Sequence, residues 1–146
     1  MRQAIARRIG WLALSLSAAA CSGAGPVVDS EIVVEPIAPS DTPSKLSWVG
    51  TWRTNWGQVD IIADGNRLLG SFSYKWEGQE RVGILVGEPV GNQLPFRWSE
   101  QKGSDKGLGR FVMSADGGKF SGHYGYDTSD ADAGSWSGRR VRESIL

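Results

Sequence analysis

Three segments of the chain repeat one pattern at a fixed spacing, and this repeat limits the available folds more than any other feature. They begin at Asp64, Val90 and Asp116, 26 residues apart, and read DGNRLLGSF, VGNQLPFRW and DGGKFSGHY. Each opens with a glycine-containing turn and continues with apolar or aromatic residues at every second position. This combination is typical of a tight turn that leads into a β-strand. A unit of this length holds one strand in each direction, so the sequence predicts repeated hairpins.

The same alternation along the rest of the chain predicts eight short strands and no helix. The expected strands cover residues 48–55, 58–63, 67–76, 80–87, 93–99, 108–114, 118–126 and 135–141. Short links between them favour an antiparallel, up-and-down (meander) order. An open sheet of this kind would expose two edges, so we expect an all-β fold in which the eight strands close into a β-barrel.

One face of the expected sheet carries nearly all of the aromatic residues. The residues that share this face are Trp52, Thr54, Trp56, Leu68, Phe72, Tyr74, Trp76, Leu94, Phe96, Trp98, Phe120, Tyr124, Tyr126 and Trp136. Gly70, Gly122 and Gly138 fall on the same face and leave room for the rings. An eight-stranded barrel is just wide enough to be filled by side chains or to hold one small ligand, so we expect this face to line the interior.

The segment GTWRTNWG at residues 50–57 resembles the first strand of the calycin superfamily, which includes lipocalins, avidins and small bacterial protease or lysozyme inhibitors. In that superfamily a Gly-x-Trp tryptophan plugs one end of the barrel, and an arginine of the last strand packs across it. The resemblance implies that Trp52 is the plug and that Arg139 or Arg140 covers it. Arg140 shares the inward parity of Trp136, which favours Arg140. The chain departs from lipocalins in lacking their terminal helix and disulfide.

The first twenty residues have the order of a secretory signal peptide. Arg2, Arg7 and Arg8 precede an apolar stretch at 9–16 and small residues at 17–20. The apolar stretch is too short for a permanent membrane-spanning helix. We therefore expect export, with residues 1–20 removed from the mature protein.

Cys21, the only cysteine, directly follows this segment. The sequence LSAAAC at 16–21 resembles the lipobox of bacterial lipoproteins, with Ala18 where leucine is usual. The resemblance implies a lipid anchor on Cys21, and Ser22 after it implies sorting to the outer membrane of the cell envelope. The alternative is ordinary cleavage after Ala20 at an A-x-A site, which would release a soluble exported protein.

Residues 21–47 are rich in serine, proline and glycine and hold only short apolar pieces, which predicts a disordered, flexible tether. Residues 48–142 then form the barrel domain, and 143–146 a short tail. Without the three signal-peptide arginines, 13 basic residues face 16 acidic ones, a net charge of −3 that lies in the tether. The neutral domain gives no electrostatic footprint for nucleic acid.

Four aromatic residues reach one end of the expected barrel with inward parity. The turns at 64–66, 91–92 and 116–118 share one end with both termini of the domain, here called the near end. The far end carries the turns at 56–57 and 77–79 and the longer loops 100–107 and 127–134. Trp56, Trp76, Trp98 and Tyr126 point to the far end, which predicts an aromatic mouth for an apolar ligand or a sugar ring. The alternative is that these rings only fill a small barrel.

The chain lacks the residues that a disulfide, a zinc site, a catalytic triad or a calcium loop would require. One cysteine allows neither an internal disulfide nor a cysteine-based zinc site, and one histidine without a Gly-x-Ser-x-Gly motif gives no triad or zinc centre. Asp127, Asp130 and Asp132 lie in one loop, but the closing glutamate of a calcium loop is absent, which favours a solvated acidic loop. We expect no metal and no cofactor.

Three functional classes follow from these features. The first is a non-enzymatic binding module for a small apolar or sugar ligand at the aromatic mouth. The second is an envelope interaction or inhibitor protein that uses loops 100–107 and 127–134 against a partner protein. A hydrolase comes third, since nothing in the sequence brings two carboxylates into one pocket. The calycin resemblance implies the first two classes at the level of fold alone.

Overall fold

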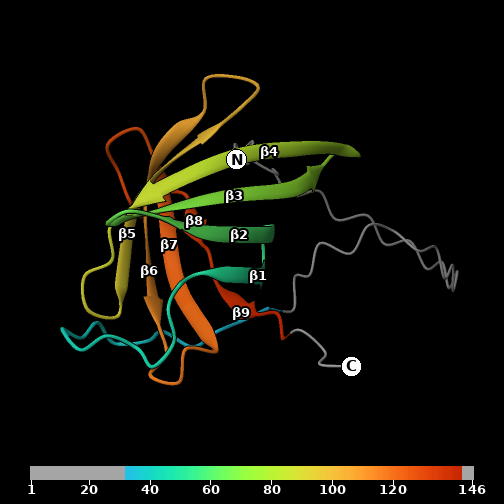
Figure 1. Ribbon diagram of the computed structural model, residues 1–146. Helices are drawn as coiled ribbons and strands as arrows, with labels where there is room; N and C mark the ends of the chain where they lie inside the picture. Colours follow the sequence, from blue (N-terminus) through green and yellow to red (C-terminus); the bar gives the residue numbers. More distant parts are fainter. Residues whose placement is uncertain (1–31, 143–146) are drawn as a thin grey trace, which may run out of the picture.

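The computed structural model describes residues 32–142, which form an all-β molecule (Figure 1). The strands are β1 (Gly50–Thr54), β2 (Gly57–Asp64), β3 (Arg67–Trp76), β4 (Gln79–Gly87), β5 (Gln93–Glu100), β6 (Lys106–Met113), β7 (Lys119–Tyr126), β8 (Gly134–Ser135) and β9 (Gly138–Arg140). Within these residues no helix has the length and apolarity needed to cross a membrane. The expectation of an all-β fold is confirmed.

The strands close into an antiparallel, up-and-down barrel, as the sequence predicts. Each of β1 to β7 pairs with the next strand along the chain. β9 pairs with both β1 and β7 and so joins the two ends of the sheet. Figure 1 shows β1–β4 running across the view and β5–β7 running steeply to them, so that the sheet curls round one interior.

The eighth expected strand, 135–141, is divided into β8 and β9. Between them Trp136 turns inward and is fully buried, while Ser137 bonds to the turn between β1 and β2. The Asn55 side-chain oxygen accepts from the Ser137 N–H at 3.0 Å, and the Asn55 N–H donates to the Ser137 carbonyl at 3.1 Å. These bonds replace regular ladder bonds and interrupt the strand.

The β3–β4 turn shows how the local sequence sets the register. Trp76 pairs with Gln79, which leaves a two-residue turn of Glu77 and Gly78. Both residues have positive φ, 49° and 76°, the geometry of a type I′ turn, whose twist matches that of the strands. Tyr74 therefore lies opposite Arg81 on the inner face.

Aromatic rings fill the barrel. Trp136 lies at their centre, with ring centroids 5.2 Å from Phe72, 5.2 Å from Phe111 and 5.7 Å from Phe96. The buried cluster consists of Trp48, Trp52, Val59, Ile61, Leu68, Phe72, Tyr74, Leu85, Leu94, Phe96, Trp98, Phe111, Met113, Phe120, Tyr124 and Trp136. Gly138 admits one of these rings, because an added Cβ would come within 2.7 Å of Phe120. Side chains thus occupy the space that a ligand would need inside.

Trp52 lies at the near end under Arg140. The Arg140 guanidinium carbon is 4.3 Å from the centre of the Trp52 ring, a cation–π distance. Arg140 also donates to the carbonyls of Ser47, Val49 and Gly117. The Trp52 indole N–H donates to the Trp48 carbonyl at 3.0 Å. Burial lowers the pKa of Arg140, yet these carbonyls stabilise its charge.

Residues 32–47 have no regular secondary structure but lie against the near end of the barrel. Figure 1 shows them in blue to cyan beside the lower ends of β5, β6 and β7. Asn92 binds this segment: its amide donates to the Ala38 carbonyl at 3.1 Å, and its side-chain oxygen accepts from the Ser40 N–H at 2.7 Å. The Ile37 N–H donates to Ser121 Oγ at 2.9 Å. The flexible tether expected over 21–47 is therefore corrected for residues 32–47, which are held by the barrel.

The remaining N- and C-terminal expectations lie outside the described residues. These are the signal peptide at 1–20, the lipid attachment at Cys21, the tether from 21 to 31 and the tail at 143–146.

Candidate functional site

The four aromatic residues predicted for the mouth all pack against the core, but to different depths. Trp98 is 2% exposed, and its indole N–H donates to the Gly125 carbonyl at 3.1 Å. Trp56 is half-buried and donates to the Ser135 carbonyl at 3.0 Å. Trp76 and Tyr126 are also half-buried. Trp98 is therefore part of the filling, and Trp56, Trp76 and Tyr126 form the rim.

The rings are linked through Tyr124, which the sequence analysis assigned only to the interior. Its centroid lies 5.9 Å from Trp56, 6.1 Å from Trp98 and 6.3 Å from Tyr126. Trp98 and Tyr126 are in direct contact, with centroids 5.5 Å apart. Trp76 lies further out, near the tip of the β3–β4 hairpin, opposite Gln79. The structure thus brings three of the four predicted residues together and sets Trp76 apart from them.

A polar group that the sequence analysis missed lies among these rings. Glu100, at the end of β5, has a side chain only 2% exposed. The Tyr74 hydroxyl donates to Glu100 Oε1, and Arg81 Nη1 lies 3.6 Å from Glu100 Oε2. A buried carboxylate requires such partners, because its desolvation is costly.

Two tyrosine hydroxyls at the far end, those of Tyr74 and Tyr124, have raised pKa values, which favour their neutral form. Burial raises the pKa of Tyr74 above its ordinary value near 10, and its hydrogen bond to Glu100 raises it further. Burial also raises the pKa of Tyr124, with smaller contributions from Tyr126 and Glu100. The Tyr124 hydroxyl is buried and has no hydrogen-bond partner among the described residues.

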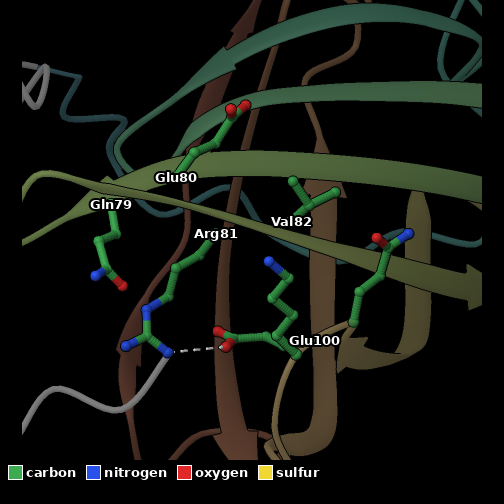
Figure 2. A pocket seen from close by; sticks show the side chains of 7 residues that line it. Gln79, Glu80, Arg81, Val82 and Glu100 are labelled. Carbon is green, nitrogen blue, oxygen red and sulfur yellow. Dashed lines mark ion pairs between the residues drawn. The ribbon is translucent and has the colours of Figure 1, made fainter.

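A cleft of about 550 Å³ opens beside this cluster (Figure 2). β5 pairs with β4 only from Gly83 onward, so the β4 segment 79–82 extends past the barrel wall. Figure 2 shows the Gln79, Arg81 and Glu100 side chains on one side of β4, and Glu80 on the other. The cleft is lined by Gln79, Glu80, Arg81, Val82, Glu100, Gln101 and Lys102. We call this site, together with Trp76 opposite Gln79, the rim cleft.

The burial of Glu100 could have been predicted from the sequence, but the predicted fifth strand ended one residue too early. The predicted fifth strand ended at residue 99, which assigned Glu100 to a loop. In the structure β5 includes Glu100, and the two-residue period that buries Leu94, Phe96 and Trp98 also buries Glu100. An inward glutamate two residues after an inward tryptophan is therefore the pattern that would have located it.

The two long far-end loops flank the rim. In the first, the Glu100 N–H donates to the Asp105 carbonyl at 3.0 Å, and residues 101–104 are exposed. In the second, Asp132 accepts from the Tyr126 N–H at 2.9 Å, so one of the three loop aspartates has a structural role. Among residues 32–142 no group of three His, Cys, Asp or Glu side chains lies close enough to hold a metal ion.

Two further hollows, of about 660 and 380 Å³, lie on the outer wall of the barrel. Both are shallow and share Val86, Arg97 and Leu108. Neither is lined by a polar side chain as deeply buried as Glu100, so the rim cleft is the better candidate.

Comparison with family models, curated proteins and solved structures finds no match to this chain. The assignment of function therefore depends on the site itself.

Proposed function

We propose that the protein is a non-enzymatic binding module that takes a sugar ring in the rim cleft. The observation that carries this proposal is the buried Glu100 beside a cleft lined by polar side chains. The half-buried Trp76 lies next to this cleft, since it pairs with the lining residue Gln79 across the β3–β4 ladder. Aromatic faces beside hydrogen-bonding side chains suit a sugar, which has an apolar face and a hydroxyl edge.

The choice of a sugar over an apolar ligand follows from the filled interior. Trp136 and its neighbours occupy the centre of the barrel, where an apolar ligand of a hollow barrel would lie. A ligand at the rim instead meets the amides of Gln79 and Gln101 and the Arg81 guanidinium. The proposed binding uses no cofactor and no metal.

We also propose a cellular setting from the N-terminal sequence. Export and a lipid anchor on Cys21 would attach the protein to the cell envelope, at the outer membrane. Residues 32–47 lie at the near end of the barrel, so such an anchor would leave the rim cleft at the opposite end. This orientation would expose the cleft to soluble or wall-bound sugars.

Isothermal titration with a panel of neutral, acidic and amino sugars tests the proposed function. At least one sugar should bind, and Trp76→Ala should weaken its binding about tenfold or more, since truncating an anchoring aromatic residue costs more than about 1 kcal/mol. Ile62→Ala is the matched control, because Ile62 is 60% exposed on the outer wall. Absence of binding by every sugar, or equal binding by the Trp76 variant, would contradict the proposal.

A protein partner at loops 100–107 and 127–134 is the second candidate, favoured by the exposure of residues 101–104 at the rim. Immobilised protein with residues 101–104 replaced by Gly and Ser should then lose a partner that the unaltered protein retains. A sugar-binding module would show no such partner.

A further inference from the structure

We infer that the ligand of the rim cleft carries a carboxylate, received by Arg81 and Lys102, so that the ligand class is an acidic sugar such as a uronic acid. This inference rests on the proposed function and adds the charge of the ligand to it.

The four charged residues that line the cleft sum to zero, but a solute does not meet them equally. Glu100 has only 2% of its side chain exposed and faces Tyr74 and Arg81. Glu80 points to the other side of β4 from Arg81, as Figure 2 shows. Arg81 is 39% exposed, and Lys102 is exposed in the loop that follows β5. Among the accessible charges of the cleft, Arg81 and Lys102 outnumber the exposed Glu80, so the charge presented to a ligand is net positive.

Glu100 also holds the arginine in place. Its Oε2 atom lies 3.6 Å from Nη1 of Arg81, and its other oxygen is fixed by Tyr74. A guanidinium has five N–H donors in a planar fork that matches a carboxylate. A side chain already positioned by a buried partner loses less conformational entropy on binding. Arg81 is therefore suited to form paired hydrogen bonds with a ligand carboxylate.

Other ligand charges fit the cleft less well. An ammonium group would meet the positive charges of Arg81 and Lys102. A neutral sugar would accept hydrogen bonds from them but would bring no opposite charge, so it would lack the ion-pair attraction that a carboxylate adds. A free inorganic anion would match the charges but has no apolar face to pack on the exposed part of the Trp76 ring.

The test is isothermal titration of the purified protein with D-galacturonate, D-galactose, D-galactosamine, acetate and inorganic phosphate. We expect D-galacturonate to bind about tenfold or more tightly than D-galactose, since its carboxylate adds an ion pair and a bidentate acceptor to the hydrogen bonds that both sugars can form. D-Galactosamine, acetate and phosphate should each bind more weakly than D-galacturonate. Added salt should weaken galacturonate binding, because the attraction is electrostatic.

Titration of variants shows which residues cause the preference for the charged sugar. Arg81→Gln and Lys102→Gln should each reduce the preference for D-galacturonate over D-galactose, whereas Glu88→Gln, at an exposed residue outside the cleft, should leave it unchanged. Lys102 is exposed, so its variant stays informative if Arg81→Gln fails to fold.

The outcomes separate this inference from the proposed function. Equal binding of D-galactose and D-galacturonate, or tightest binding of D-galactosamine, overturns the acidic-sugar class but leaves sugar binding in place. Acetate or phosphate binding as tightly as D-galacturonate overturns the class in favour of a simple anion site. Retention of the preference by folded variants of both Arg81 and Lys102 also overturns it. Failure of every sugar to bind overturns both proposals.

Discussion

Two buried tyrosines at the far end of the barrel, Tyr74 and Tyr124, differ in whether their hydroxyl groups form a hydrogen bond. Both rings are buried, Tyr124 completely and Tyr74 to 6% exposure. The Tyr74 hydroxyl donates to Glu100, while the Tyr124 hydroxyl has no partner among residues 32–142. Removing each hydroxyl should therefore have different effects on stability.

Tyr74→Phe should lower the free energy of unfolding by about 1.5–3 kcal/mol, because it removes a hydrogen bond to a buried carboxylate. Tyr124→Phe should be neutral or stabilising, because it removes a buried hydroxyl that forms no bond in the protein. Urea unfolding of the two variants, which differ from the unaltered protein by one oxygen each, measures this contrast. Equal losses in the two variants would argue against the Tyr74–Glu100 bond.

The raised pKa values of both tyrosines predict a loss of stability at alkaline pH. In the unfolded chain a tyrosine ionises near pH 10, whereas in the folded protein these two keep their protons. The folded state then binds more protons than the unfolded state, so stability is intact below about pH 10 and falls as the pH rises further. Each tyrosine contributes up to about 1.4 kcal/mol per pH unit.

Urea unfolding at about pH 9, 10 and 11 checks this expectation. Tyr124→Phe should fall less steeply over this range than the unaltered protein. Identical slopes for the two proteins would show that Tyr124 titrates normally.

At the scale of elements, the hairpins could be predicted from the sequence because the residues of each turn determine its geometry locally. Glycine-containing turns such as Glu77-Gly78 fix strand register locally, and the alternating aromatics fix which face is buried. The break between β8 and β9 escaped prediction because it depends on Asn55, 82 residues from Ser137. The docking of residues 32–47 escaped for the same reason, since Asn92 lies 52 residues from Ser40. Pairings at such separations leave no periodic trace in the sequence.

Asn92→Ala should release the segment 32–47 from the barrel. The Asn92 side chain binds Ala38, Ser40 and Met113, and it is 7% exposed. Loss of these three hydrogen bonds should lower the free energy of unfolding by about 3 kcal/mol. Trypsin should cleave after Lys45 slowly in the unaltered protein, where the Lys45 N–H donates to the Ala115 carbonyl, and rapidly in the variant.

Asn66→Ala, in the exposed β2–β3 turn, is the control for this variant. It should leave both stability and cleavage after Lys45 nearly unchanged. Rapid cleavage of the unaltered protein at Lys45 would show that the segment is a free tether after all.

At the scale of the molecule, closure of the sheet brings the aromatic side chains of its strands together, and these side chains fill the barrel. β9 pairs with β1 and β7, and the rings from all sides meet around Trp136. The aromatic face was evident from parity, but parity alone left both a filled and a hollow barrel open. That choice depends on how the side chains interlock across strands, such as Gly138 against Phe120. The rim cleft escaped prediction for a related reason, since it depends on how far β4 extends past β5.

Trp136→Ala should be among the most damaging single changes. It removes a fully buried indole that contacts Phe72, Phe96 and Phe111 and donates to Thr54 Oγ1 at 3.2 Å. The expected loss is about 3–5 kcal/mol, whereas Ile62→Ala on the outer wall should change stability by less than about 0.5 kcal/mol. Chemical denaturation of both variants decides; similar small losses would mean that the barrel is not filled around Trp136.

The most direct test of a filled barrel with its site at the rim is NMR mapping of backbone amide shifts during titration with D-galacturonate. The account predicts shifts confined to residues 76–82 and 98–102, with the Trp136 indole and residues 32–47 unchanged. Shifts centred on Trp136 and the rings around it would show a ligand inside the barrel and would contradict the account.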